Sequence, residues 1–154
     1  MKENIIKIKS FEFGKRIVRM SIYLERSKKE FVLSKQLKRS GTAPGALVRE
    51  SEHAESKANF KHKLAIAQKE CDETLYWLEL LIESEIISND SLKSMHFEAQ
   101  ELLKLLKSII LTYSFCLFSY PNSFIFELKI LFPILDQNIS NAVPLVSPKP
   151  GNRF

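Results

Sequence analysis

The fold is decided by residues 57–85, which read KANFKHKLAIAQKECDETLYWLELLIESE. Along this stretch, apolar or small side chains recur at alternating intervals of four and three residues. Such spacing places them on one face of an α-helix, where they can form the buried seam of a helical bundle. Ser56 directly precedes the stretch and is a residue type that caps helix N-termini. The predicted seam consists of Phe60, Leu64, Ala67, Cys71, Thr74, Leu78 and Leu81.

A second helix is predicted over residues 90–112, where the alternation of three and four residues returns. Asn89, Asp90 or Ser91 can cap its N-terminus. Only the short polar segment 88–90 separates it from the preceding helix, so the two helices must be antiparallel neighbours. Its seam consists of Leu92, Met95, Ala99, Leu102, Leu106 and Ile109.

Two further helices are predicted in the N-terminal part of the chain. The first covers about residues 12–26, and the second begins near residue 27. Pro44 lies inside the second, where a proline costs about 3 kcal/mol and usually kinks the helix. The second is therefore either one kinked helix that ends near His53 or two pieces broken near residue 42. We favour the single helix, because the apolar spacing resumes after the proline. The apolar faces are predicted to carry Phe13, Ile17, Met20 and Leu24 in the first helix and Phe31, Leu33, Leu37 and Val48 in the second.

Four helices with short links predict an all-α protein, an up-down-up-down antiparallel four-helix bundle over residues 1–112. No stretch of this part shows the sustained alternation of a β-strand. The composition then changes, because the last 42 residues carry eight of the 16 aromatic residues and five of the six prolines. We therefore treat residues 113–154 as a separate, atypical C-terminal extension that is weakly structured and poorly ordered.

The chain contains two apolar runs around the start of this extension, residues 109–120 and 124–135. Neither reaches the roughly 20 residues that a membrane-spanning helix needs, so we expect no membrane span. A short helix is expected near residues 123–132, and the proline-rich end, residues 144–154, is expected to be disordered. The abrupt change of composition leads to the hypothesis that the extension is accidental, as after the loss of the usual stop signal.

Charge is distributed unevenly, and the net charge of +5 is the remainder of larger local imbalances. Residues 1–69 carry +10, residues 70–112 carry −6 and the extension carries +1. The predicted topology collects many of the lysines and arginines at one end of the bundle. Clustered cations bind phosphates, so this basic end is a candidate surface for RNA or DNA, although the charge could serve solubility alone. The candidate nucleic-acid-binding residues are Lys15, Arg16, Arg19, Arg49, Lys57, Lys61 and Lys63.

No group of residues predicts catalysis or a metal centre. The histidines, His53, His62 and His96, form no His-Glu-x-x-His motif, and there is no Cys-x-x-Cys pair. Cys71 lies on the predicted seam, so we expect a buried structural thiol rather than a nucleophile. Two cysteines and the lack of an apolar N-terminal run fit a cytoplasmic location. We predict a protein that is not an enzyme, with no catalytic residue, no metal site, no cofactor and no small-molecule substrate.

Two groups on the predicted helix at 57–85 have both a functional and a structural interpretation. Glu70, Asp72 and Glu73 could suggest a di-iron site, but such bundles need Glu-x-x-His motifs, so we expect a solvated acidic face. Tyr76 and Trp77 could stack on nucleobases, but packing in the core and at interfaces is the favoured interpretation.

Residues 38–42, KRSGT, could suggest a phosphate site, but no Gly-rich loop follows a strand here. We expect instead that Ser40 and Gly41 let neighbouring helices approach closely, while Lys38 and Arg39 stay in solvent.

Three segments carry a resemblance to a known family: QLKRSGT at 36–42, ANFKHKLAIAQKECDETLYWLELL at 58–81 and EAQELLKLLKSIILT at 98–112. The chain resembles the bacterial four-helix bundle proteins called 23S ribosomal RNA intervening-sequence proteins, over about residues 11–112. It follows their typical line F…KL-IA-KE--ET-YWL-LL. The matching positions are Phe60, Lys63, Leu64, Ile66, Ala67, Lys69, Glu70, Glu73, Thr74, Tyr76, Trp77 and Leu78.

The resemblance implies a four-helix bundle that assembles into a ring-like homopentamer, in which five copies would multiply a weak basic patch through avidity. The chain is also similar to the accessory protein of diversity-generating retroelements, which is basic and binds nucleic acid and a reverse transcriptase. We therefore expect a non-enzymatic oligomeric bundle that binds RNA or DNA through its basic end. The alternative is a structural or protein-interaction module, such as an accessory partner of a nucleic-acid enzyme, that binds no nucleic acid itself.

Overall fold

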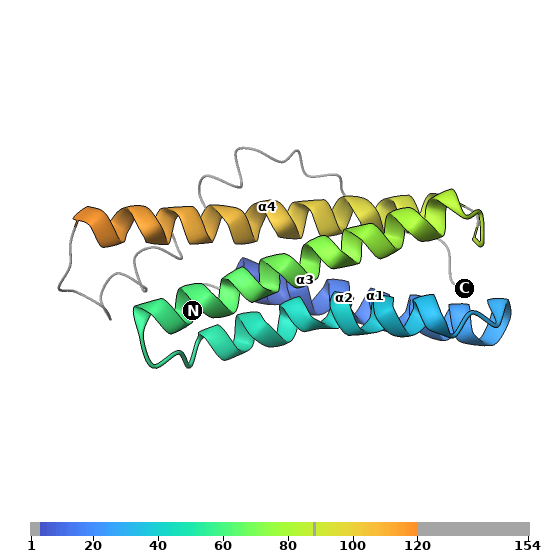
Figure 1. The fold of residues 1–154 in the computed structure, drawn as a ribbon, viewed down its shortest axis with the longest axis horizontal. Coiled ribbons are helices and arrows are strands. Elements are labelled where there is room, and N and C mark those ends of the chain that lie inside the picture. The colour runs from blue at the N-terminus through green and yellow to red at the C-terminus, as the bar shows by residue number, and fades with distance from the viewer. Residues whose placement is uncertain (1–3, 88, 120–154) are drawn as a thin grey trace. The chain divides into compact units, whose positions relative to one another are not determined.

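The computed structural model describes residues 4–87 and 89–119, and this part of the chain is helical, without a strand. The four α-helices form the predicted up-down-up-down antiparallel bundle (Figure 1). The elements are, in order, α1 (Ile5–Tyr23), the π-helical turn η1 (Leu24–Lys28), α2 (Val32–Ser51), α3 (Lys57–Glu83) and α4 (Asn89–Ser119).

Helices that follow one another in the chain are also neighbours in the bundle. α1 packs on α2, α2 on α3 and α3 on α4, while a smaller contact between α1 and α4 closes the bundle. The start of α1, the end of α2, the start of α3 and the end of α4 lie at the same end (Figure 1). The helix ends that the sequence analysis brings together are therefore together in the structure.

The seams predicted on α3 and α4 are buried along their whole length. Each of their residues, from Phe60 to Leu81 and from Leu92 to Ile109, is at most 5% exposed. Tyr113 continues the α4 seam, with its ring 4.8 Å from that of Phe60 between centroids. These two helices therefore pack as the heptad spacing predicts.

α1 and α2 bury a different seam, in which small residues stand between a few large ones. Four of its serine hydroxyls donate hydrogen bonds to carbonyl groups of their own helix, three or four residues earlier, at 2.7–3.2 Å. A serine satisfied in this way needs no partner on the neighbouring helix, so the two helices can lie close together. The buried residues are Ile6, Ser10, Phe13, Ile17 and Ser21 on α1 and Ser34, Leu37, Ser40, Gly41, Pro44, Val48 and Ser51 on α2.

Two glycines of α2 mark the closest approach of this pair. A Cβ atom at Gly41 would lie 2.8 Å from side-chain atoms of Ile17, and one at Gly45 would lie 3.3 Å from the carbonyl oxygen of Ser10. The predicted close approach at Ser40 and Gly41 is thus confirmed, since both are buried.

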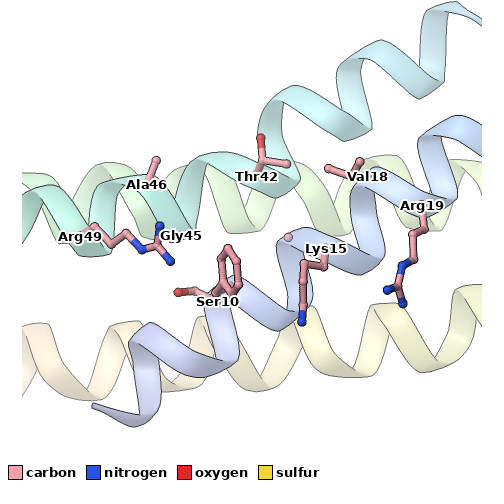
Figure 2. Close-up of a pocket in the computed structure, with 10 residues that line it drawn as sticks. Ser10, Lys15, Val18, Arg19, Thr42, Gly45, Ala46 and Arg49 are labelled. Atoms are coloured by element: carbon pink, nitrogen blue, oxygen red, sulfur yellow. The ribbon is translucent and has the colours of Figure 1, made fainter. Parts of the chain in front are cut away.

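α2 runs unbroken through Pro44, from Val32 to Ser51. The prediction of a single helix is confirmed, and the alternative of two separate pieces is wrong. In the view of Figure 2, the axis of α2 changes direction near Thr42, as expected where a proline removes a hydrogen-bond donor.

The start of the chain and the α1–α2 connection differ from the prediction. α1 begins at Ile5 rather than residue 12, because Ile6 is buried and anchors an additional turn. α2 begins at Val32 rather than near residue 27, since η1 and a left-handed Lys29, with φ 57°, come first. Phe31, predicted on the apolar face of this helix, precedes it and is 61% exposed.

Side-chain caps fix two helix starts. The Glu30 carboxylate accepts hydrogen bonds from the backbone N–H groups of Val32 and Leu33, each at 2.8 Å. The Ser56 hydroxyl accepts one from the Asn59 N–H at 3.1 Å, which confirms the predicted cap of α3.

α4 continues to Ser119, seven residues past its predicted end at 112. Burial of Tyr113 explains part of this difference, because the seam has one more anchor than expected. The helix predicted near residues 123–132 and the disorder predicted for 144–154 lie outside the described residues. No helix in residues 4–87 and 89–119 is long and apolar enough to cross a membrane.

Candidate nucleic-acid interface

A groove of about 460 Å³ lies between α1 and α2. Three of the residues that line it are cations, and none of the ten is acidic. Figure 2 shows Lys15 and Arg19 extending from α1 and Arg49 from α2. We call this feature the α1–α2 groove. It is lined by Ser10, Phe11, Gly14, Lys15, Val18, Arg19, Thr42, Gly45, Ala46 and Arg49.

Phe11 is the aromatic residue of the groove, and it is 47% exposed. The guanidinium carbon of Arg49 lies 4.7 Å from its ring centroid, and the Lys15 Nζ lies 5.4 Å from it. Both distances are within the range of cation–π interactions. Lys15 also pairs with the Glu12 carboxylate at 2.7 Å, an exposed contact of the kind that stabilises little. Cations from two different helices thus gather at one accessible ring.

Small residues keep the groove open. At Gly14, an added Cβ would meet nothing within 4 Å, so the missing side chain leaves free space beside Phe11. Gly45 lies on the facing helix, where the α1 backbone is close. The groove therefore depends on small residues at both of its walls.

The structure brings together three of the seven predicted nucleic-acid-binding residues, namely Lys15, Arg19 and Arg49. Arg16 lies on another face of α1, where its guanidinium binds the Glu98 carboxylate and the Ser94 hydroxyl of α4.

The other three candidates lie on α3 and do not line the groove. Lys57 is the first residue of α3, and Lys61 is exposed one turn later. Lys63 donates a hydrogen bond to the Glu50 carboxylate of α2 at 2.8 Å. The predicted cluster is therefore divided among three surfaces, because Arg16 lies toward α4 and the three lysines of α3 lie away from the groove.

Carboxylates offset part of the predicted basic end. Lys7 pairs with Glu52 at 2.7 Å, and Lys9 pairs with Glu101 at 3.2 Å. Each pair joins two helices, so the lysine charge is compensated locally. The residues that line the α1–α2 groove include no carboxylate, and one of its three cations, Lys15, pairs with a carboxylate nearby, that of Glu12.

Comparison with known proteins agrees with the fold and the segments quoted above. The model of the 23S rRNA-intervening sequence protein family matches residues 2–108. The chain belongs to this family. The matched range contains every residue of the α1–α2 groove, so the groove lies within the family domain.

A solved relative supports the same assignment. The chain is similar to a protein of the S23 ribosomal protein family from Bacteroides thetaiotaomicron, described as a protein with unknown function. The two are 51% identical, the match covers 68% of this chain and 97% of that chain, and the TM-score is 0.67. No curated protein matches the chain.

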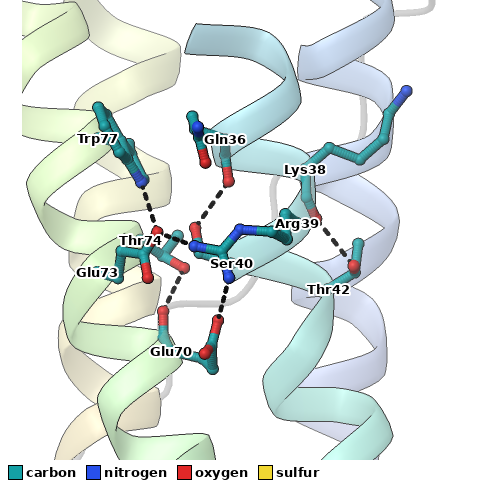
Figure 3. Close-up of polar contacts among 9 residues, drawn as sticks. All are labelled: Gln36, Lys38, Arg39, Ser40, Thr42, Glu70, Glu73, Thr74 and Trp77. Carbon is teal, nitrogen blue, oxygen red and sulfur yellow. Dashed lines mark hydrogen bonds and ion pairs between the residues drawn. The ribbon is translucent and has the colours of Figure 1, made fainter. Parts of the chain in front are cut away.

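A polar cluster joins α2 to α3 outside the groove (Figure 3). The Arg39 guanidinium binds the Glu73 carboxylate and lies 3.5 Å from that of Glu70. The Trp77 indole N–H donates to Glu73 at 3.1 Å. The hydrogen bond from Trp77, and then Arg39, lower the pKa of the Glu73 carboxyl. The predicted solvated acidic face is wrong for Glu70 and Glu73, which are 16% and 26% exposed because they bind α2.

This cluster also bears on the predictions for neighbouring residues. Trp77 packs its ring edge-on to Tyr76 at 4.9 Å, but Tyr76 is 55% exposed, so the prediction of core packing is wrong for Tyr76. Arg39 is 55% exposed and Lys38 pairs with Glu25 at 3.3 Å, so both side chains reach the solvent as expected but also bind carboxylates.

Cys71 is a buried structural thiol, as predicted. Its Sγ donates to the Ala99 carbonyl oxygen at 3.3 Å, and burial raises its pKa to about 12. His96 forms a contact of 2.9 Å with Glu79. Among the described residues, no group of three or more His, Cys, Asp or Glu is placed to hold a metal ion.

The sequence analysis missed Phe11 and Gly14 as parts of the candidate interface. Residues 11–16, FEFGKR, contain a usable signal, because Phe11 and Lys15 are one helical turn apart. Arg49 could not be joined to them from the sequence, since only the packing of α2 on α1 brings it to the Phe11 ring.

Proposed function

We propose that this bundle binds RNA or DNA through the α1–α2 groove, as a non-enzymatic protein of the cytoplasm. The observation that carries the proposal is the gathering of Lys15, Arg19 and Arg49 around one groove with no acidic lining residue. Phosphate groups are the common anions that bind such clustered cations without needing a defined sequence. The predicted oligomer would present several copies of this groove and raise the affinity through avidity.

A salt titration tests the proposal. Binding of a fluorescently labelled single-stranded RNA, followed by anisotropy, is expected to weaken steeply as salt increases. Three phosphate contacts per groove predict a slope of roughly −2 for log K against log salt concentration. The double variant Arg19→Gln, Arg49→Gln is expected to reduce that slope to roughly −0.7, because one cation remains.

A matched control separates this groove from net charge. Lys69→Gln with Lys93→Gln removes two exposed cations that do not line the groove, so it changes the net charge equally. We expect this control to keep the wild-type slope. An equal loss in both double variants would overturn the groove as the site, and no binding at low salt would overturn nucleic-acid binding altogether.

A protein-interaction module is the second candidate function, and exposed apolar residues at the α1–α2 turn favour it. Ile22, Tyr23, Phe31 and Val32 are 38%, 42%, 61% and 69% exposed. Apolar side chains gathered at one place on a surface are typical of association sites. We propose that this turn contacts a second copy of the chain in the predicted homo-oligomer.

Light scattering after size exclusion tests the second candidate. Phe31→Ser with Val32→Ser, at residues outside the buried seam, is expected to lower the measured mass if this turn joins the copies. A monomeric wild type would overturn self-association. In that case, capture of one specific protein by the wild type but not by the variant, in nuclease-treated extract, would assign the turn to a different partner.

A further inference from the structure

Phe11 has a position that phosphate binding alone does not require. Its ring is 47% exposed inside the α1–α2 groove, and Lys15 and Arg49 approach it within cation–π distance. A ring of this kind would be expected in the core if it served only packing, as Phe13, two residues later, is 3% exposed. The exposed ring and the cations therefore form one combined surface.

We infer that Phe11 is a stacking platform for an unpaired nucleobase, and that the α1–α2 groove therefore selects single-stranded over double-stranded nucleic acid. This inference rests on the proposed function. Aromatic rings beside clustered cations are the usual means by which proteins hold single strands, since the ring stacks on a base while the cations bind the backbone. In a duplex, the bases stack on one another and their faces cannot reach Phe11.

The groove has room for a base at this ring. Its volume of about 460 Å³ is within the range of roughly 300–1,000 Å³ that is usual for small-molecule sites. Gly14 leaves space open, because nothing lies within 4 Å of a Cβ added there. Thr42 and Ser10 also line the groove, and their hydroxyls donate hydrogen bonds to carbonyl oxygens of their own helices, at 2.8 Å and 3.2 Å, so the lining beside the ring is largely apolar.

The cations beside the ring can bind phosphates instead once a base stacks on the ring. Cation–π contacts at an exposed ring are weak, so a base can replace them without a large loss. The exposed pair between Lys15 and Glu12 is also easily broken, because water and salt screen it. Lys15, Arg19 and Arg49 would then bind the phosphates that flank the stacked base.

Trp77 is a weaker candidate for the same role. Its indole N–H is bonded to the Glu73 carboxylate, and Glu70 lies at the same cluster. These carboxylates would repel a phosphate next to a base stacked on Trp77. Phe11 has the opposite surroundings, with no acidic residue among those that line its groove.

A pair of matched oligonucleotides tests the inference with the full-length protein. One is a labelled single-stranded RNA, and the other has the same length and phosphate number but carries abasic positions in its centre. The wild type is expected to bind the intact strand roughly 5- to 100-fold more tightly than the abasic strand, as stacking of one base predicts. Deoxy versions of both strands and a duplex of the intact sequence complete the set.

Two variants that should lose the preference and one that should keep it locate the effect. Phe11→Leu keeps an apolar side chain but removes the ring, so it is expected to bind intact and abasic strands equally while the salt slope stays unchanged. Gly14→Leu fills the open space and favours the helix, so it should fold and lose the same preference. Phe11→Tyr keeps a ring and is expected to keep the preference.

The outcomes separate the two proposals. If the wild type binds both strands equally and with salt dependence, the stacking inference is wrong while the phosphate site stands. If neither strand binds at low salt, the proposed function is wrong, and the stacking inference that rests on it is wrong as well. A duplex that binds as tightly as the intact single strand would also overturn the inference.

Discussion

The helix pair α3–α4 packs mainly through large leucines, whereas the pair α1–α2 places serines and glycines between a few large apolar residues. Leu64, Leu78, Leu92 and Leu106 are each at most 2% exposed, and the heptad spacing of their seams is regular. On the other side of the bundle, Gly41 occupies the position that faces Ile17, and Ser40 next to it is buried. Large side chains fill the space between helices, while small ones bring the backbones together.

This difference in packing indicates on which side of the bundle a surface groove can form. A leucine seam places its apolar residues inside and leaves few openings. On the α1–α2 side, by contrast, Phe11 lies at the groove and is 47% exposed, while Phe13 and Ile17 of the same helix are buried. The α1–α2 groove lies on the side packed through small residues, so the irregular helix pair carries the candidate interface.

The largest effect is expected from breaking the leucine seam. Leu78→Ala removes a side chain that is 0% exposed, and the remaining cavity is expected to lower the free energy of unfolding by about 2–5 kcal/mol. Chemical denaturation measures the loss. Phe11→Ala, on the exposed side of the other pair, should lose less than about 1 kcal/mol, and equal losses would contradict the proposed difference between the pairs.

The second effect tests the close approach of α1 and α2. Gly41→Ala puts a Cβ atom 2.8 Å from buried Ile17, and this overpacking is expected to cost about 1–3 kcal/mol. Gly14→Ala meets nothing within 4 Å and improves helix propensity, so it should add up to about 1 kcal/mol. The two glycine variants, compared by denaturation, must therefore differ in sign, and a gain at Gly41 would show that the backbones are farther apart.

A smaller effect on stability is expected at two serines of the α1–α2 seam, one with a hydrogen-bonded hydroxyl and one without. The buried Ser34 Oγ has no hydrogen-bond partner among the described residues, while Ser51 donates to the Val48 carbonyl at 2.7 Å. Ser34→Ala is expected to raise the free energy of unfolding by up to about 1 kcal/mol, and Ser51→Ala to lower it by about 0.5–1.5 kcal/mol. A loss at Ser34 equal to that at Ser51 would mean that Ser34 has a partner such as bound water.

The same contrast explains how much of the fold could be predicted from the sequence. The α3 and α4 seams follow from the spacing of Leu64, Leu78, Leu92 and Leu106, because large apolar residues at heptad intervals have one stable arrangement. The α1–α2 seam is made of serines and glycines, which occur equally often on surfaces. The prediction therefore placed Phe31 on the apolar face and, apart from Ser40 and Gly41, did not identify the small residues of this seam.

The candidate interface was predictable only in part, for a related reason. Sequence analysis can indicate that Lys15, Arg19 and Arg49 share one end of the bundle, because topology alone brings them there. It cannot give the rotation of each helix about its axis, and this rotation turns Arg16 toward Glu98 and leaves Lys15 in the groove. Resemblance to the family predicts the fold, but it does not predict on which face of its helix each side chain lies.

The smallest effect is expected at the polar cluster that joins α2 to α3. Glu73→Gln keeps an acceptor for Trp77 but removes the charge that binds Arg39, so at pH 7 we expect a Tm lower by on the order of a few °C. The pKa of Glu73 is lowered in the folded protein, first by the Trp77 hydrogen bond, so the wild-type advantage is present above the unfolded-state pKa of about 4.3.

That advantage is lost as the pH falls through the folded-state pKa, because the folded carboxylate must then take up a proton. The Tm difference between wild type and Glu73→Gln should therefore narrow as the pH falls below the unfolded-state pKa of about 4.3, as thermal unfolding followed by circular dichroism can measure. Trp77→Phe removes the indole donor, so the folded-state pKa of Glu73 should lie closer to the unfolded-state pKa, and the narrowing should be smaller and complete at a higher pH. A difference that stays constant over this range would mean that Glu73 binds α2 without its charge, and that α2 and α3 are joined by packing alone.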